Sequence, residues 1–343
     1  MLNYLETLMI QTQSIIKKLK NQIDLNANES DYLANYIING KFDSNQIASF
    51  LTFLYIKGES YQEIYSFISL LKKKMKKLKL GEDVMDTCGT GGDHKNSFNF
   101  STATSISLSA CNIKIAKHGN RSVTSKSGSF DVLEKLGIKI DLDLNQTKKF
   151  FKKNGICFLF APRYHPILKN YSEVRKSLTF RTIFNLLGPL LNPVSLKYQL
   201  LGVSEENNLT THAQSLAKFN IEKAWVVHNE NGYDELTTTS KNLIIEIKKG
   251  VVKKKKILDP KEFGFKECKE EDLRGGSAEE NAFMMRRVFD GETGPIRDNL
   301  ILNSAAGLLI SEKVKTLAEG IDLIQNKINN GVVSEKLIAL TEN

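Results

Sequence analysis

The sequence predicts an α/β protein in which a small helical domain accompanies a larger domain with a mainly parallel central sheet. Three observations lead to this fold class. Apolar residues recur at helical spacing up to about residue 80, and short apolar runs alternate with helical segments after residue 83. Two of those runs, at Ile156–Ala161 and Ala224–Val227, contain no polar residue. Such strands are typical of a parallel sheet covered on both faces.

The composition is that of an ordinary globular protein. The 343 residues suffice for about two domains, and 41% are hydrophobic and 25% charged, which excludes disordered and collagen-like chains. We expect no membrane span and no signal peptide, because no apolar run is long enough and the N-terminus lacks a basic region. We expect free thiols in a reducing cytoplasm, since no CxxC pair occurs among Cys88, Cys111, Cys157 and Cys268.

The net charge of +9 reflects an excess of lysine, part of which lies in two runs. One run comprises Lys72–Lys74 with Lys76, Lys77 and Lys79, and the other is Lys253–Lys256. A solvated helix face and a solvated turn are the interpretation that we favour. A patch that binds polyanions is the alternative.

The first 80 residues carry the start and stop signals of short helices. The apolar residues of 32–37 share one face ahead of Gly40, and those of 47–54 repeat this spacing ahead of Gly58. Ser60 and Glu63 form a capping-box pair at the start of a further helix. We therefore expect a small all-helical unit, whose remaining apolar surface can serve as a subunit interface.

Strands followed by helices are expected after residue 83. Asp83–Cys88 and Ile113–Lys117 are the first two predicted strands. A helix of small residues follows from Ser101, and another covers Asp131–Leu136. This alternation of strands and helices predicts the parallel sheet.

A glycine-rich segment, DTCGTGGD at Asp86–Asp93, begins within the first predicted strand, and its three glycines, Gly89, Gly91 and Gly92, follow the end of that strand. Glycine permits positive φ and close approach of a ligand, and successive N–H groups can hold an anion. Asn99, Ser101 and Thr102 follow at the expected helix start, where phosphate is favoured. The spacing matches neither a dinucleotide-binding fingerprint nor a Walker loop. A phosphate loop and a plain tight turn both remain open.

A second loop and an acidic pair add candidate binding residues. The segment Lys117–Ser129 sets cationic side chains among Gly, Ser, Thr and Asn beyond the end of a predicted strand, which favours anion binding over a solvated loop. Asp234 and Glu235 follow another strand and can hold magnesium bridged by phosphate oxygens, although such a pair is usually only solvated. Spacing does not decide which arginine faces a site; the candidates are Arg163, Arg175 and Arg181.

Taken together, these segments closely resemble the family of anthranilate phosphoribosyltransferases of tryptophan biosynthesis. The resemblance covers most of the chain and is specific because many motifs occur in one order. They are GESYQEI, GTGGD, NFSTATS, KHGNRSVTSKSGSFDVLEKLG, FLFAPRYHPILKNYSEVRKSL, RTIFNLLGPLLNP, QLLGV, DEL and GGSAEENA.

The resemblance implies a nucleoside-phosphorylase-like fold with a hinge between the two domains. The expected limits are 1–82 for the helical domain, 83–172 for the first α/β part, 173–198 for a return to the helical domain, and 199–343 for the second α/β part. It also implies transfer of the phosphoribosyl group of phosphoribosyl pyrophosphate (PRPP) to the anthranilate amine, with two Mg²⁺ ions per subunit. A cytoplasmic homodimer formed through the helical domain is expected, without a membrane or nucleic acid as partner.

The resemblance also assigns roles to residues at matching positions. No obligate general base is expected, because the arylamine nucleophile is neutral at pH 7. Thr179 stands where the family commonly has glycine, and a positive φ there would strain the chain. The implied anthranilate contacts are Gly89, Asn120 and Arg175, and the implied metal ligands are Ser101, Asp234 and Glu235. The implied PRPP contacts are Gly89, Gly92, Asp93, Ser97, Asn99, Ser101, Thr102, Lys117, His118, Gly119, Asn120, Arg121, Ser122, Ser125 and Ser129.

Two other functions compete with this interpretation. A pyrimidine-nucleoside phosphorylase shares the fold, but NLLGPLLNP and the Asp-Glu pair speak against it. A nucleic-acid binder derived from a transferase would account for the +9 charge. The intact acidic pair, Asn120 and Arg175 argue against that second alternative.

Overall fold

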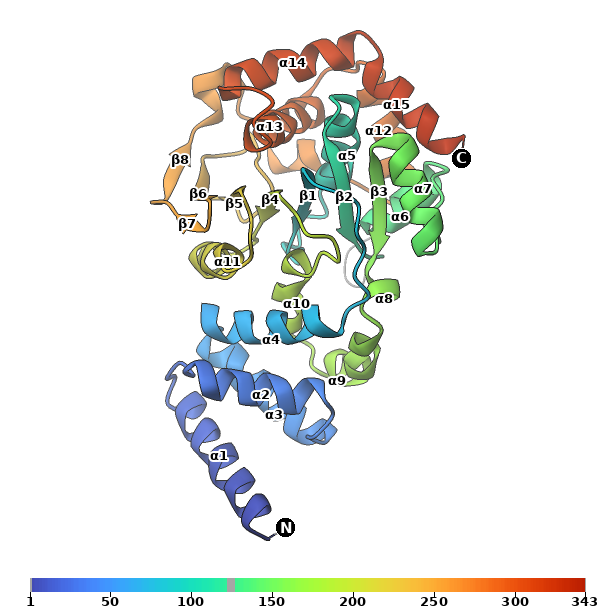
Figure 1. Cartoon of the computed structure of the whole chain (residues 1–343). Coiled ribbons are helices and arrows are strands. Elements are labelled where there is room, and N and C mark those ends of the chain that lie inside the picture. The colour runs from blue at the N-terminus through green and yellow to red at the C-terminus, as the bar shows by residue number, and fades with distance from the viewer. Residues whose placement is uncertain (1, 122–126, 343) are drawn as a thin grey trace. The chain divides into compact units, whose positions relative to one another are not determined.

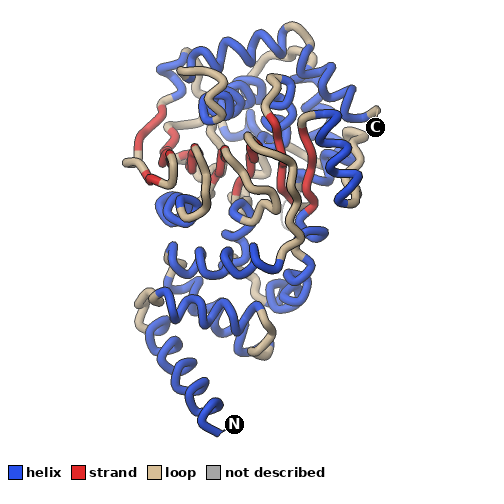
Figure 2. The backbone as a smooth tube through the Cα atoms, viewed as in Figure 1, coloured by secondary structure: helices blue, strands red, loops and turns tan. Residues whose placement is uncertain are grey.

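The computed structural model describes residues 2–121 and 127–342. The chain divides into two compact units, Met1–Lys76 with His165–Leu191, and Lys77–Tyr164 with Asn192–Asn343. Figure 2 distinguishes a unit of helices from one that also contains strands. The unit limits differ from the expected domain limits: the helical unit ends at Lys76 rather than 82, and the return segment covers 165–191 rather than 173–198.

Contacts at the limits explain this difference. Tyr171, which precedes the expected return, already belongs to the helical unit, because its hydroxyl donates a hydrogen bond of 3.0 Å to the carbonyl of Ile37. In the other unit, the N–H of Leu78 donates to the carbonyl of Pro193 at 3.1 Å. That bond ties residues 77–82 to the segment that returns after Leu191.

The helical unit follows the start and stop signals of its sequence. Ser60 caps one helix, and the capping box with Glu63 is confirmed: the N–H of Ser60 donates to Oε2 of Glu63 at 2.8 Å. The buried Glu63 also accepts from the N–H of Leu25 and pairs with Lys57 at 3.0 Å. The elements are α1 (Leu2–Lys20), α2 (Ala27–Ile38), α3 (Ser44–Lys57), α4 (Tyr61–Lys74), η1 (Pro166–Tyr171), α9 (Ser172–Ser177), α10 (Ile183–Leu187) and η2 (Gly188–Leu190).

The second unit is built on one sheet in the order β3-β2-β1-β4-β5-β6-β7, with β8 paired to β6 (Figure 1). Strands β1 to β5 are parallel, and β6 to β8 extend the sheet beyond β5 as antiparallel strands. The mainly parallel sheet predicted from the sequence is confirmed. The strands are β1 (Val84–Gly89), β2 (Lys114–Gly119), β3 (Ile156–Phe160), β4 (Tyr198–Gly202), β5 (Lys223–Asn229), β6 (Asn242–Lys248), β7 (Val251–Val252) and β8 (Lys256–Leu258).

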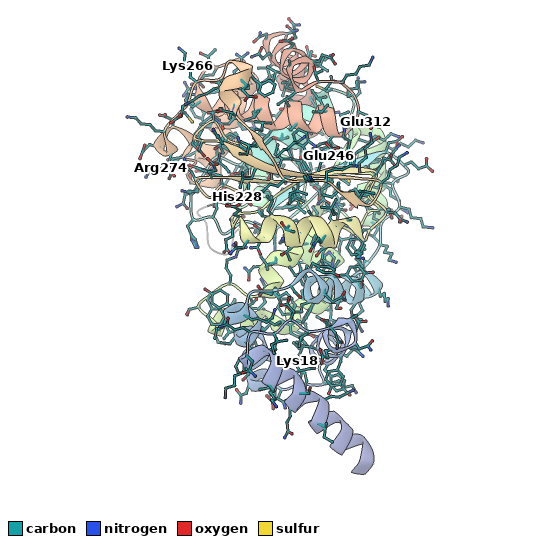
Figure 3. The ribbon with its side chains drawn as sticks, turned by 90° about the vertical axis from the view of Figure 1, so that its left-hand side faces the viewer. Lys18, His228, Glu246, Lys266, Arg274 and Glu312 are labelled. Carbon is teal, nitrogen blue, oxygen red and sulfur yellow. The ribbon has the colours of Figure 1, made fainter. Side chains whose placement is uncertain are left out.

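Helices cover both faces of this sheet. α5 packs on β1 and β2, α13 packs on β4 and β5, and α11 packs on β5, β6 and β7. α11 and α13 lie on opposite sides of the strands in Figures 1 and 3; Figure 3 labels His228 on β5 and Glu246 on β6. The helices are α5 (Phe100–Ala110), α6 (Ser129–Lys135), α7 (Leu144–Asn154), α8 (Ala161–Tyr164), α11 (Asn207–Ala217), η3 (Pro260–Phe263), η4 (Glu270–Leu273), α12 (Ala278–Phe289), α13 (Pro295–Ile310), α14 (Leu317–Asn329) and α15 (Val332–Thr341).

Further sequence expectations can be compared with the described residues. None of the four cysteines, all of which are among the described residues, forms a disulfide bond, and Cys88, Cys111 and Cys157 are buried. The lysines of both runs are exposed or half-buried, as a solvated face requires. None of the described helices is both long and apolar enough to cross a lipid bilayer.

Candidate functional site

The candidate site lies where the strand order of the sheet changes direction. The chain proceeds from β1 outward to β2 and β3, and then returns to the other side of β1 with β4 and β5. In open α/β sheets ligands bind at such a point, beyond the carboxyl ends of the strands. The glycine-rich turn follows the carboxyl end of β1, and Asp234 and Glu235 follow the carboxyl end of β5, at the same edge of the sheet.

Two glycines allow the segment after β5 to cross the end of β4 and reach the turn after β1. Gly89 and Gly202 are paired at the ends of their strands. A Cβ atom on Gly202 would collide with the backbone of Asp234, and one on Gly89 would collide with its side chain. The N–H of Gly91 donates to Oδ2 of Asp234 at 2.7 Å. The close approach therefore sets Asp234 directly against the glycine-rich turn.

A cluster of three carboxylates results. Oxygen atoms of Asp93, Asp234 and Glu235 lie within 4.8 Å of one another. Oδ2 of Asp93 and Oε2 of Glu235 are buried and have no hydrogen-bond partner within residues 2–121 and 127–342. Carboxylate oxygens are the donors that Mg²⁺ prefers, and the two buried unpartnered oxygens need a cation or a proton. The residues therefore fit a magnesium ion.

Burial, reinforced by mutual repulsion, raises the pKa values of two members of this cluster, Asp93 and Glu235. Burial, followed by the charge of Asp234, raises the pKa of Asp93 to about 7. Burial and the charges of Asp234 and Asp93 raise the pKa of Glu235 well above its usual range. Lys95 opposes the shift at Asp93, and Lys117 opposes it at Glu235.

Lys117 is a buried cation on β2. Its Nζ donates to the carbonyl of Thr87 at 2.9 Å and to Oγ of Ser101 at 3.2 Å. Burial lowers the pKa of Lys117, while the charges of Asp86, Glu235 and Asp234 counteract this effect. The ammonium group thus connects β1 to the first turn of α5, next to the carboxylates.

Asp86 on β1 supports the ends of β1 and β2 through buried hydrogen bonds, a role that the sequence did not suggest. It is buried, and its carboxylate accepts from the N–H of His118 at 3.2 Å and from Nδ2 of Asn192 at 2.8 Å. Asn192 also donates to the carbonyl of Ala116 at 2.8 Å. The only feature of the sequence that could have indicated this role of Asp86 is its position as the first residue of the glycine-rich segment.

The start of α5 presents further polar groups. Asn99 occupies the N-cap position without capping the helix through its side chain. Oδ1 of Asn99 and Oγ1 of Thr102 are buried without a hydrogen-bond partner in the part of the chain that the structure describes. Ser97, which precedes the helix, forms a β-bridge with Arg274, which Figure 3 labels. The free N–H groups of a helix start favour phosphate.

The second loop is described only in part, since Ser122 and Ser125 lie outside the described residues. Ser129 begins α6, and its Oγ donates to the carbonyl of Asn120 at 3.2 Å. A Cβ atom on Gly119 would lie only 2.5 Å from Oγ of Ser129. Arg121 is directed toward α6, where a second set of acids holds its guanidinium; these are Glu134 at 2.6 Å and Asp131 at 3.4 Å.

Two of the three arginine candidates, Arg175 and Arg163, lie in different units and have different surroundings. Arg175 belongs to the helical unit, on α9, where its guanidinium lies 5.5 Å from the centre of the Phe184 ring and burial lowers its pKa. Arg163 forms an ion pair with Asp141. Among the described residues Thr179 has no positive φ, so the strain considered for it does not arise.

Comparison with known proteins defines the class of this fold and site. Residues 81–333 match the family model described as the glycosyl transferase family, a/b domain, and residues 13–75 match that of its helical bundle domain. The chain is 43% identical, over 96% of its length and 98% of the relative, to anthranilate phosphoribosyltransferase of Thermoanaerobacter sp. (strain X514). It is 44% identical, over 95% of both chains, to that of Acetivibrio thermocellus.

Solved structures agree with these matches. Anthranilate phosphoribosyltransferase from Thermus thermophilus superposes with a TM-score of 0.87 at 32% identity, covering 96% of this chain and 98% of the other. The enzyme from Saccharomyces cerevisiae in complex with PRPP and Mg gives a TM-score of 0.87 at 27% identity, covering 96% and 97%. The chain belongs to the anthranilate phosphoribosyltransferase family.

The first prediction concerns Gly202. Gly202→Ala should displace Asp234 from the turn and reduce transferase activity by on the order of 100-fold, because a Cβ there has no room. Gly188→Ala is the matched control, since a Cβ on Gly188 meets nothing within 4 Å. Steady-state kinetics, with circular dichroism to verify folding, measure the effect. If Gly202→Ala were as active as the control, the close approach of Asp234 to the end of β4 would not be needed for activity.

The second prediction concerns pH. Because Asp93 has a pKa of about 7 in the folded, metal-free protein and about 4 when unfolded, the folded state binds more protons between these values. The free energy of unfolding should therefore decrease, relative to that of Asp93→Asn, as pH rises from about 4 to about 7, and then level off. Denaturation in EDTA, followed by the fluorescence of Trp225, measures this difference. A difference independent of pH would show that Asp93 titrates normally.

Proposed function

We propose that the chain transfers the phosphoribosyl group of PRPP to the amine of anthranilate, giving N-(5-phosphoribosyl)anthranilate and pyrophosphate, in tryptophan biosynthesis. The observation that carries this proposal is the meeting of a glycine-rich turn, buried Lys117 and three carboxylates at one edge of the sheet. Enzymes that match nearly the whole chain, including one solved with PRPP and Mg, support the same reaction.

Departure of pyrophosphate is the step that this site has to assist. Negative charge grows on the diphosphate as its bond to the ribose C1 breaks, and bound Mg²⁺ would supply charge neutralisation. Asp93, Asp234 and Glu235 would hold the metal, together with Ser101 from the first turn of α5. We propose two ions per subunit, following the family resemblance.

Backbone and lysine groups would bind the phosphates. Gly91 and Gly92 have φ of 64° and 71°, so the turn after β1 adopts a conformation that favours glycine. Its N–H groups and those at the start of α5 can donate to phosphate oxygens. Lys117 holds an ammonium group beside Ser101, at 3.2 Å. This preorganised set of donors stabilises the developing charge without rearrangement.

The amine nucleophile needs positioning rather than a strong base. Arylamines are neutral near pH 7 and carry an available lone pair, so the proposal includes no obligate proton acceptor. Arg175 is proposed to recognise the anthranilate carboxylate, with Gly89 and Asn120 as further contacts. A guanidinium group suits this role because it binds carboxylates through two parallel hydrogen bonds.

The proposal extends to assembly and location. We propose a homodimer formed through the helical unit, which exposes the apolar side chains Ile10 on α1 and Ile56 on α3 by 66% and 62%. Apolar surface of this kind is typical of protein interfaces. We also propose a cytoplasmic location, supported by the four described cysteines, none of which is in a disulfide bond.

The test of the proposed function, our third prediction, follows anthranilate fluorescence in the presence of PRPP and Mg²⁺. The wild-type chain should consume anthranilate, and Asp234→Asn combined with Glu235→Gln should reduce kcat/KM by on the order of 100-fold or more. Arg175→Ala should chiefly raise KM for anthranilate. Arg163→Ala, whose side chain pairs with Asp141, is the matched control and should change neither constant.

One result would reject the proposed reaction, and another would reject only the proposed role of Arg175. Wild-type protein that leaves anthranilate unchanged but splits uridine or thymidine with phosphate would be a nucleoside phosphorylase. Unchanged anthranilate dependence in Arg175→Ala would reject the positioning role of that arginine and leave the reaction itself untouched.

A further inference from the structure

A second lysine, Lys95, lies at the far end of the glycine-rich turn. Its Nζ contacts Oε1 of Glu270 at 2.8 Å and lies 5.2 Å from the centre of the Tyr233 ring. Tyr233 is buried and directly precedes Asp234 in the chain. One ammonium group thus connects three separate segments: the turn that carries Asp93, the helix η4, and the segment that carries Asp234.

The backbone around Lys95 is in an uncommon conformation. His94 and Asn96, on either side, have φ of 56° and 50°. Residues with a Cβ adopt this left-handed region at a cost, and they persist there when surrounding contacts hold them. After Asn96 such contacts come from the backbone, because its carbonyl accepts from the N–H of Gly275 at 2.8 Å. On the side of Asp93, the contacts of Lys95 take this role: its N–H donates to Oδ1 of Asp93 at 3.2 Å.

The charges of the cluster explain why a restraint is needed there. Three carboxylates within 4.8 Å repel one another, and Asp93 is the member carried by the turn rather than by the segment after β5. Lys117 acts on the cluster from the buried side of the sheet, whereas Lys95 is near Asp93 and its side chain is 21% exposed. A solvent-exposed ion pair stabilises little by itself, so its effect is expected in the geometry of the cluster.

We propose that Lys95 is a positioning residue that, through its ion pair with Glu270 and its contact with Tyr233, holds Asp93 against Asp234 and Glu235 and thereby sets the affinity for Mg²⁺. This inference rests on the proposed function in taking Mg²⁺ as the ion. Lys95 acts through Asp93 and takes no part in binding substrate. Interactions of this kind, one step removed from the metal, typically change metal affinity by 10- to 100-fold.

The test compares Lys95→Met, Lys95→Arg, Glu270→Gln and the double variant Lys95→Met/Glu270→Gln, all in the full chain. Lys255→Met is the control, because Lys255 forms a more exposed lysine–glutamate pair, with Glu206 at 2.7 Å, in the same unit. Binding of Mg²⁺ alone is measured by titration calorimetry. Hydrogen exchange of the amides of residues 93–98 is measured by mass spectrometry in EDTA, and activity is measured against Mg²⁺ concentration.

Lys95→Met and Glu270→Gln should each weaken Mg²⁺ binding by roughly tenfold and speed exchange of the 93–98 amides. The double variant should be no weaker than either single one, and Lys95→Arg should retain wild-type binding. At saturating Mg²⁺, kcat should stay within about twofold of wild type, because the machinery itself is intact. A general loss of structure would lower kcat as well.

Three outcomes would overturn the inference. The first is unchanged amide exchange at residues 93–98 in Lys95→Met. The second is an Mg²⁺ affinity of Lys95→Met equal to that of the Lys255→Met control. The third is loss of Mg²⁺ affinity in Lys95→Met but not in Glu270→Gln. The last outcome would mean that Lys95 acts as an isolated charge. A wild-type chain that fails to consume anthranilate would reject the proposed function instead, and amide exchange would still decide the role of Lys95.

Discussion

The passage of Asp234 across the end of β4 is the constraint on which the site depends. The glycine-rich turn and the Asp-Glu pair follow strands that are not neighbours, because β4 lies between β1 and β5. The absence of side chains at Gly89 and Gly202 lets the chain cross at contact distance, and the hydrogen bond from the N–H of Gly91 then fixes Asp234 against the turn. Parallel strands bring their carboxyl ends to one edge, and these glycines reduce the remaining separation to the size of a metal site.

The crowding of negative charge at this edge has a functional consequence. A metal-free cluster retains protons that an ordinary carboxyl would have lost, as the pKa of about 7 for Asp93 indicates. Cations reduce the repulsion from two directions, Lys117 from within the sheet and Lys95 from the loop. The site is therefore held in a shape that favours a divalent ion over the empty state, at some expense in the stability of the metal-free protein.

Much of the fold was predictable because buried parallel strands are recognisable as uninterrupted apolar runs. β3 and the centre of β5 are of this kind, and the helices of the first unit carry capping signals such as Ser60 with Glu63. The antiparallel edge formed by β6 was missed, and no local pattern specifies strand order. For the site, the residue types of each loop left phosphate and metal binding open, and the family resemblance of the segments taken together predicted both. The inclusion of Asp93 in the carboxylate cluster and the pairing of Lys95 with Glu270, 175 residues apart, depend on tertiary contacts alone.

The most direct test of the central claim is anomalous diffraction from crystals of the full chain grown with Mn²⁺ and pyrophosphate. An Mn²⁺ peak bonded to oxygen atoms of Asp93, Asp234 or Glu235, with pyrophosphate reaching the N–H groups of the glycine-rich turn, is the result that the account predicts. Metal bound elsewhere, or these three carboxylates far apart without a shared ion, would contradict it.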